Sequence, residues 1–370
     1  MSEKSNAIVT VALISAVILL LSAADVLKED RLYSETENRV LAARPEFSLE
    51  SLFSGSFTED YETYVTDQFA ARDKWIALKT RQDIFLQKQE TGGVYLGKDG
   101  YLLERHLPED YSGENTEKKL ELLERLAEDW NAAVMLVPTA DNVLTDKMPA
   151  NAPYFDQKAF LEQAAERLGE EHYIDVFSVL TEHSREEIYY RTDHHWTSLG
   201  AYYGYRAWAD FAGTEPYPYD TANLKLAAEG FRGTLQSKIN LDWGSDAIYY
   251  FEETEQFPVT VTYDLQDVSH TLYEEDYLDT KNKYGFFLDD NHALVEIDAG
   301  NRTGKSLFVI KDSYANCLIP LLVPHYDTIY VLDLRYYNGR LYPLLEQYAS
   351  EADVLVLYNC IHFLEDFVYA

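Results

Sequence analysis

Apolar residues recur with three different spacings along this chain, and each spacing predicts a different kind of element. Residues 7–24 form an almost uncharged apolar run of 18 residues, just long enough to cross the core of a bilayer as a helix. Residues 29–90 are charged, with apolar side chains at the spacing of amphipathic helices. From residue 91 onward, short apolar runs alternate with amphipathic segments, which is typical of a sheet covered by helices.

The segments between residues 91 and 211 predict helices and strands in alternation. Two short strands are expected within 91–103, around the turn Lys98-Asp99-Gly100. Helices are predicted at 115–131, 155–168 and 198–211, with Thr197 or Ser198 as the cap of the last, and strands at 132–138 and 173–177. Because helices and strands alternate, we predict a mostly parallel sheet that is covered on both faces.

The pattern changes at about residues 213–303, where prolines and short alternating segments predict loops and strands. We interpret this part as an insertion beside the functional site, with residues 230–238 as its most site-like piece. Strands are predicted again at 306–310, 328–333 and 353–358, and a helix at 315–322. The predicted organisation is a membrane anchor or signal segment at 1–28, a helical juxtamembrane region at 29–90 and an α/β domain at 91–370.

The first 28 residues have two interpretations. Lys4 and the amino terminus precede the apolar run, which favours an amino terminus on the inside and an exported body. The stretch Ser22-Ala23-Ala24 resembles the cleavage site of a signal peptide. We favour an uncleaved single-pass anchor in the cell membrane, because the run is long and the residues before it carry little positive charge. Under either interpretation the body is extracellular, as a secreted protein if the segment is cleaved.

Charge and cysteine content narrow the classes of partner. Acidic residues outnumber basic ones by 64 to 31, for a formal net charge of −33. Such a surface repels phosphate backbones, so we expect no nucleic-acid partner. Cys317 and Cys360 form no CxxC pair and follow apolar runs, which favours buried apolar cysteines over a zinc finger or a disulfide framework. Whether the two form a single bridge is left open.

The stretch Asp193-His194-His195-Trp196 places an acid, two imidazoles and an indole side by side. On an extended backbone Asp193 and His195 point to the same side, and His194 points to the other. The acid can then hold one ring nitrogen of His195 and leave the other free, which is the orienter-and-base half of a catalytic triad. A metal site and a purely structural buried network are the alternatives. Adjacent histidines diverge on a strand and no HExxH motif is present, so we expect no metal and no cofactor.

A nucleophile for this base occurs much later in the chain. Ser313 stands between the predicted strand at 306–310 and the predicted helix at 315–322, where a hydroxyl is exposed beside backbone N–H groups. Taken alone, Asp312-Ser313 is more typical of a helix cap. However, Ser313 and the Asp193 stretch are both expected at the carboxyl edge of one sheet, where α/β proteins build their sites. We therefore predict that they meet.

The motif from Thr192 to Thr197 resembles the signature of the DHHW family of bacterial exported proteins. Further similarity lies at 97–102, 137–139, 233–235, 311–314 and in the last strand. That family is similar to the alginate O-acetyltransferases of the SGNH hydrolase superfamily. The resemblance implies an SGNH-like α/β fold with Ser313 as nucleophile, His195 as base and Asp193 as its orienter. Lys311 departs from the glycine of the SGNH pattern, and His194 competes with His195 as the base.

The resemblance also implies donors for an oxyanion and contacts for a substrate. The backbone N–H of Ser313 is one expected donor, and an asparagine after a later strand is another, for which Asn359 is a better candidate than Asn142. His194, Trp196 and Asp312 complete the set of oxyanion-binding or substrate-binding candidates.

The chemistry implied is acyl transfer in two steps, through an acyl-serine, with acetyl as the expected group and a cell-surface glycan as the substrate. A sugar hydroxyl as acceptor makes the protein an O-acyltransferase, and water makes it an esterase. An extracellular transferase needs a multi-span membrane O-acyltransferase as the partner that supplies acyl groups. The alternative is a non-catalytic glycan-binding or cell-envelope protein with a degenerate site, in which some of the many tyrosines stack on sugar rings.

Overall fold

The computed structural model describes residues 3–34, 36, 39–111 and 113–367. The chain folds into two compact units. The smaller unit is formed by the chain up to Lys88 together with Ser237–Asp242, and the larger unit by the remaining residues. The candidate site residues all belong to the larger unit.

The smaller unit begins with α1 (Glu3–Leu27), in which Lys4–Asp25 has a mean hydropathy of 2.7. Among the described residues it is the one helix that is long and apolar enough to cross a membrane. The rest of the unit contains the strand pair β1 (Tyr33–Ser34) and β2 (Arg39–Val40) and the helices α2 (Leu49–Ser54), α3 (Ser56–Gln68) and α4 (Arg72–Phe85). These helices were predicted as amphipathic, yet their buried members are polar residues such as Asp67 and Thr80, and Trp75 is exposed.

The larger unit is built on a seven-stranded sheet with the order β10-β9-β11-β13-β12-β14-β6. Its strands are β6 (Ala133–Val137), β9 (Thr260–Tyr263), β10 (Asp267–Ser269), β11 (Leu294–Asp298), β12 (Ser306–Lys311), β13 (Thr328–Asp333) and β14 (Asp353–Asn359). β13, β12, β14 and β6 pair in parallel, as predicted. β11, β9 and β10 come from the predicted insertion and extend the sheet with antiparallel strands.

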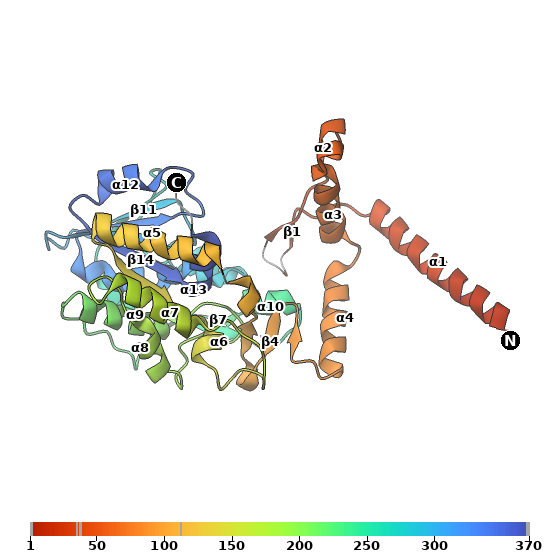
Figure 1. Ribbon diagram of the computed structural model, residues 1–370, viewed down its shortest axis with the longest axis horizontal. Helices are drawn as coiled ribbons and strands as arrows, with labels where there is room; N and C mark the ends of the chain where they lie inside the picture. Colours follow the sequence, from red (N-terminus) through yellow and green to blue (C-terminus); the bar gives the residue numbers. More distant parts are fainter. Residues whose placement is uncertain (1–2, 35, 37–38, 112, 368–370) are drawn as a thin grey trace. The chain divides into compact units, whose positions relative to one another are not determined.

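Helices cover both faces of this sheet. Successive residues of each buried strand point to opposite faces, so each strand contributes side chains to two hydrophobic cores. In β12, Phe308 and Ile310 belong to one core and Leu307 and Val309 to the other. The first core also includes α5 (Glu114–Trp130), α7 (Gln157–Leu168), α12 (Leu341–Tyr348) and α13 (Cys360–Asp366). The second includes α6 (Ala140–Val143), α8 (Val176–Glu182), α9 (Ser198–Phe211) and α11 (Ile319–Leu322). Figure 1 shows α5 lying along the strands.

Smaller elements complete the unit. β3 (Glu90–Thr91), β4 (Val94–Leu96) and β5 (Leu102–Glu104) form an antiparallel sheet. β7 (Lys225–Phe231) pairs with β8 (Asp246–Tyr250). The helix α10 (Thr234–Ile239) lies between them in the sequence, and its residues from Ser237 onward belong to the smaller unit. Turns of 3-10 helix occur at Lys98–Gly100, Pro108–Asp110, Glu252–Gln256, Glu275–Asp279, Lys283–Phe286, Ser313–Cys317 and Val323–His325.

Two predicted elements differ from the structure. The strand predicted at 173–177 is reduced to one bridge between Tyr173 and Val134, because Asp175 caps α8 by accepting the N–H of Ser178 at 3.1 Å. The helix predicted at 315–322 begins as a 3-10 turn and becomes α-helical only at α11. Cys317 and Cys360 are buried and do not form a disulfide, which confirms the prediction of buried apolar cysteines.

Candidate active site

The segment that carries Asp193 is a series of bends, so the extended backbone that we expected is wrong. It is shaped by Asp246 on β8, whose carboxylate accepts the backbone N–H groups of Arg191 and Thr192 at 2.9 Å each. The same carboxylate accepts the hydroxyl of Thr192 at 2.6 Å. A contact with a residue more than 50 positions later therefore sets the local conformation.

Asp193 is buried and forms two hydrogen bonds with His195. One carboxylate oxygen lies 2.6 Å from His195 Nδ1 and accepts the His195 backbone N–H at 3.0 Å. The other accepts the backbone N–H and the hydroxyl of Thr234 at 2.8 and 3.1 Å. Burial opposes the charge on Asp193, but the two imidazoles and these hydrogen bonds hold its pKa far below the ordinary value.

Gly233 lets this contact form. A Cβ at position 233 would lie 2.2 Å from Asp193 Cβ and 2.4 Å from its carboxylate, closer than atoms can approach. The Gly233-Thr234 pair falls inside the 230–238 segment that the sequence marked as site-like. The pair packs against Asp193, and Thr234 donates to the carboxylate oxygen that faces away from His195.

His195 Nε2 lies 2.8 Å from Ser313 Oγ, so Asp193, His195 and Ser313 form one hydrogen-bonded chain. Ser313 opens the 3-10 turn after β12, and the turn is fastened from two sides. Asp312 caps it by accepting the N–H of Tyr314 at 3.0 Å. The indole N–H of Trp196 donates to the Tyr314 carbonyl at 2.8 Å. Trp196 is fully buried, so it holds the turn rather than facing a substrate, contrary to our expectation.

Tyr284 is a neighbour of the site that no sequence signal marked. Its ring stacks on His195, with centroids 3.8 Å apart and planes 12° from parallel. Its hydroxyl donates to the Ser313 carbonyl at 3.0 Å. Tyr284 lies in the insertion, which therefore contributes directly to the site.

The two histidines of the motif lie together, although alternation on a strand predicts that they diverge. Their ring centroids are 3.9 Å apart, and His194 Nδ1 lies 2.7 Å from the hydroxyl of Thr234. Burial and the neighbouring His195 lower the pKa of His194 to about 3. His194 is therefore a neutral side chain near pH 7, and Ser313 hydrogen-bonds with His195.

Asp312 is fully buried, and its carboxylate links the end of β12 to the end of β14. The prediction that it contacts the substrate is therefore wrong. Its second oxygen accepts the N–H of Asn359 at 3.0 Å and lies 2.8 Å from His362 Nδ1. Burial opposes both charges, but the pair's mutual attraction raises the pKa of His362 and lowers that of Asp312. His362 was missed because an isolated histidine in a helix carries no local signal.

The two candidate asparagines occupy different environments. Asn359 Oδ1 caps α13 by accepting the N–H groups of Ile361 and His362, and its amide nitrogen lies 3.5 Å from the Val137 carbonyl. Asn142 uses its oxygen for the N–H of Gln157 and its amide for Asp141. Of the two, Asn359 ends β14, the strand that pairs with β12, and Ser313 comes two residues after β12.

Lys311 stands where the SGNH pattern has glycine, and its side chain is buried among polar partners. Its ammonium donates to Asn291 at 3.0 Å and to Asn316 at 2.8 Å, and pairs with Asp333 at 3.2 Å. Burial lowers the pKa of Lys311. The side chain thus points into a separate network and leaves the turn at Ser313 free to form.

Metal binding would use the same side chains as the hydrogen-bonded chain. Asp193, His194 and His195 each offer a ligand atom, and these atoms lie within 4.8 Å of one another. Both ring nitrogens of His195 already face partners, as does Nδ1 of His194. A metal ion would have to displace these hydrogen bonds, so the two arrangements exclude each other.

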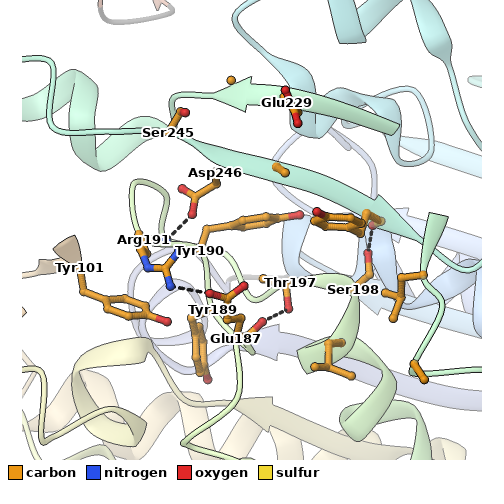
Figure 2. Close-up of a pocket in the computed structure, with 16 residues that line it drawn as sticks. Tyr101, Glu187, Tyr189, Tyr190, Arg191, Thr197, Ser198, Glu229, Ser245 and Asp246 are labelled. Atoms are coloured by element: carbon orange, nitrogen blue, oxygen red, sulfur yellow. Dashed lines mark hydrogen bonds and ion pairs between the residues drawn. The ribbon is translucent and has the colours of Figure 1, made fainter. Parts of the chain in front are cut away.

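A cavity of about 790 Å³ is lined by residues on both sides of the Asp193 motif, at 189–191 and 197–199, whereas Asp193, His195 and Ser313 do not line it. Aromatic rings of Tyr101, Tyr189 and Tyr249 line it together with the carboxylates of Glu187 and Glu229. Figure 2 shows Arg191 between Tyr101 and Asp246, with Glu187 at its guanidinium group. Tyr249 is 43% exposed, so its ring is accessible to a ligand.

The DHHW protein family matches residues 121–332, which is more than half of the chain. The chain belongs to the DHHW family. The matched span of this DHHW protein includes Asp193, His195 and Ser313, and the resemblance inferred from the motif is confirmed. None of the curated proteins compared with the chain matches it.

Solved structures show what fold this DHHW protein has. A DHHW family protein from Eubacterium siraeum is 24% identical, with a TM-score of 0.62 over 75% of this chain and 94% of that chain. Bacillus cereus PatB1 with a sulfonyl adduct is 20% identical, with a TM-score of 0.58 over 74% and 95%. The O-acetyltransferase domain of Pseudomonas putida AlgJ is 15% identical, with a TM-score of 0.44 over 75% and 94%. The first two confirm the SGNH-like α/β fold that the resemblance implied.

Proposed function

We propose that this DHHW protein is an exported serine-dependent O-acyltransferase or esterase that acts on an extracellular glycan, with acetyl as the acyl group. The observation that carries the proposal is the hydrogen-bonded chain from Asp193 through His195 to Ser313. In this hydrogen-bonded series the ionised carboxylate of Asp193 holds one ring nitrogen of His195, and the other ring nitrogen faces the hydroxyl of Ser313. This is the arrangement that activates a serine.

In the first step Ser313 Oγ attacks the carbonyl carbon of an acyl ester while His195 Nε2 takes its proton. The carbon–oxygen bond to the leaving alcohol then breaks, and that alcohol receives the proton from His195. In the second step His195 takes a proton from the acceptor, whose oxygen attacks the acyl-serine. The proton returns to Ser313 as the new ester or the free acid leaves. Asp193 keeps His195 in the required tautomer throughout.

The negative charge formed on the carbonyl oxygen needs donors in both steps. We assign the backbone N–H of Ser313 and the side-chain amide of Asn359 to this role. Asn359 is held by its own cap of α13 and by its backbone bond to Asp312. These contacts would keep the amide in place as the charge develops.

Binding of a glycan is supported by the cavity that residues on both sides of the Asp193 motif line. Its volume is in the range of ligand-binding cavities, roughly 300–1,000 Å³, and it combines tyrosine rings with hydroxyl and carboxylate groups. Sugar rings stack on such aromatic faces while their hydroxyls bond to the polar groups. PatB1 carries a sulfonyl adduct in its solved structure. An adduct of this kind forms when a nucleophile attacks a sulfonyl reagent, which supports a reactive group on this fold.

The helix α1 supports attachment to a membrane, with the larger unit outside the cell. If the acceptor is a sugar, the acyl groups must be delivered across the membrane, and we propose a multi-span O-acyltransferase as the supplier. If the acceptor is water, no such partner is needed. Comparing acetyl release into water with acetyl transfer to added oligosaccharide separates these two activities.

The proposal is tested by labelling the full chain with a fluorophosphonate, which reacts with activated serines. Wild-type protein should be labelled at Ser313 and should turn over an acetyl ester, and Ser313→Ala should lose both. Absence of both labelling and turnover in correctly folded wild-type protein would rule out the proposed serine-dependent activity.

A non-catalytic glycan-binding protein is the second candidate, favoured by the cavity and its exposed Tyr249. It predicts oligosaccharide binding with no labelling of Ser313. The catalytic proposal predicts oligosaccharide binding and labelling of Ser313 in the same protein.

A further inference from the structure

A second carboxylate–imidazole pair lies directly beside Ser313. Asp312 precedes the serine in the chain, is fully buried, and lies 2.8 Å from His362 Nδ1. The other described hydrogen bonds of its carboxylate come from the backbone N–H groups of Tyr314 and Asn359. Among the described hydrogen bonds of Asp312, His362 is therefore the partner that can carry a charge.

The position of Asp312 creates an electrostatic problem for acyl transfer. The reaction places a negative charge near the N–H of Ser313, and an adjacent buried carboxylate repels that charge strongly, because little water screens it. A cation bonded to Asp312 removes the repulsion. A neutral partner leaves it in place.

The other cations near this turn are directed elsewhere. Lys311 and Arg335 both pair with Asp333, at 3.2 and 2.6 Å. The charge of Arg335 also lowers the pKa of Asp312, but less than His362 does, and it forms no described hydrogen bond with that carboxylate. On the His362 side, the charges that act on the imidazole are those of Asp312, Arg335 and Glu104. His194, whose ring centroid is 5.6 Å from that of His362, is neutral near pH 7.

We propose that protonated His362 is a positioning residue that cancels the charge of Asp312 beside the oxyanion formed at Ser313. The inference rests on the proposed acyl transfer at Ser313. Burial disfavours the imidazolium, yet Asp312 outweighs it and raises the pKa of His362 above its ordinary value of 6.5. The pair is thus neutral overall while His362 holds its proton, and it becomes negatively charged when His362 loses that proton as pH rises. Acylation of Ser313 should slow as that happens.

The test is the rate of fluorophosphonate labelling of Ser313 in the full chain, measured from pH 5 to 10. His362→Gln leaves Asp312 charged without a cation, and labelling near pH 6 should fall about tenfold. The double variant Asp312→Asn with His362→Gln removes both charges and keeps two groups that can hydrogen-bond. It should recover labelling to within about threefold of wild type and show no alkaline decline from this pair.

The outcomes separate a charge effect from a structural one. If His362 only supports the fold, the double variant should be at least as slow as His362→Gln, which overturns the inference. Equal rates for wild type and His362→Gln at every pH also overturn it. If the double variant does not fold, the wild-type profile decides, because labelling without an alkaline decline contradicts the inference. Wild-type protein that is never labelled defeats the proposed function, and this inference with it.

Discussion

The ring of Tyr284 lies against the imidazole of His195, 3.8 Å between centroids, while its hydroxyl donates to the carbonyl of Ser313. One side chain thus contacts both partners of the 2.8 Å bond between His195 and Ser313. Tyr284 comes from the insertion, whose strands also extend the central sheet. The insertion is therefore part of the site rather than an addition to the surface.

Replacing Tyr284 by Phe should keep the stacked ring and remove the hydrogen bond. We expect a loss of about 1 kcal/mol in the free energy of unfolding, with labelling of Ser313 largely preserved. Tyr284→Ala also removes the ring and leaves a cavity beside His195, for a loss of roughly 3–5 kcal/mol and much slower labelling. Denaturant unfolding and fluorophosphonate labelling measure the two effects. Equal behaviour of the two variants would show that the stack contributes nothing.

The two histidines of the motif should differ sharply in their effect on activity. His195→Gln removes the group that faces Ser313, and labelling should fall by about 10³–10⁴-fold. His194→Gln keeps a side chain that can bond Thr234, and we expect less than about a tenfold change. Because the pKa of His194 is about 3, its removal should leave the pH dependence between pH 5 and 9 unchanged. A larger loss for His194→Gln would reverse the assignment of the base.

The central strands were predictable from local patterns, and the shape of the motif was not. β12, β13 and β14 are continuous apolar runs because helices cover both their faces, so the sequence shows them directly. The bends at Asp193 depend on Asp246, Gly233 and Thr234, which follow 40 to 53 positions later. No local pattern contains those contacts, which is why the direction of His194 was predicted wrongly.

Residues that reach the site from other segments were missed for a related reason. Ser313 could be paired with His195 because each stands in a recognisable motif and both were expected at one sheet edge. Tyr284 is one of 30 tyrosines, and His362 is a single histidine inside a short helix. Their importance comes from their neighbours in space, and one sequence does not record those neighbours.

Gly233→Ala should disturb the site without touching Ser313 or His195. The added methyl group would lie 2.2 Å from Asp193 Cβ, so the aspartate or the turn must move away. His195 would lose its orientation, and we expect labelling of Ser313 to fall at least about tenfold, since a displaced carboxylate no longer fixes the tautomer. A crystal structure of the variant would show the displacement. Wild-type labelling would mean that the turn adapts freely.

Asp193 should also make stability depend on pH at the acid end. Its pKa is lower in the folded protein than the ordinary value of 3.8, so the unfolded chain takes up the proton first as pH falls. The stabilisation is present above about pH 4 and is lost progressively below it. Thermal unfolding at pH 3, 4, 5 and 7 should therefore show a weaker acid dependence for Asp193→Asn than for wild type. Glu351→Gln, at an exposed position, controls for the change in net charge, and identical slopes for all three proteins would contradict the prediction.

The cavity beside the motif predicts which glycans bind. Its lining carries the carboxylates Glu187, Glu229 and Asp246 against the one cation Arg191. This excess and the net charge of −33 disfavour anionic chains, whereas the exposed ring of Tyr249 favours neutral sugar rings. With Ser313→Ala protein, which cannot turn over a substrate, a neutral N-acetylglucosamine tetramer should bind more tightly than an alginate tetramer in calorimetric titrations. Tighter binding of the anionic tetramer would contradict this charge argument.

Tyr249 offers the sharpest test of that cavity, because it is exposed and its replacement should not disturb the fold. Tyr249→Ala removes the accessible ring, and the Kd for the neutral tetramer should rise at least about tenfold, as expected for the loss of one stacking contact of about 1.4 kcal/mol. Tyr154→Ala is the matched control, since Tyr154 is 41% exposed against 43% for Tyr249 and does not line the cavity. Both variants should unfold at the wild-type temperature. If the two lose affinity equally, or neither does, the glycan binds elsewhere on the protein.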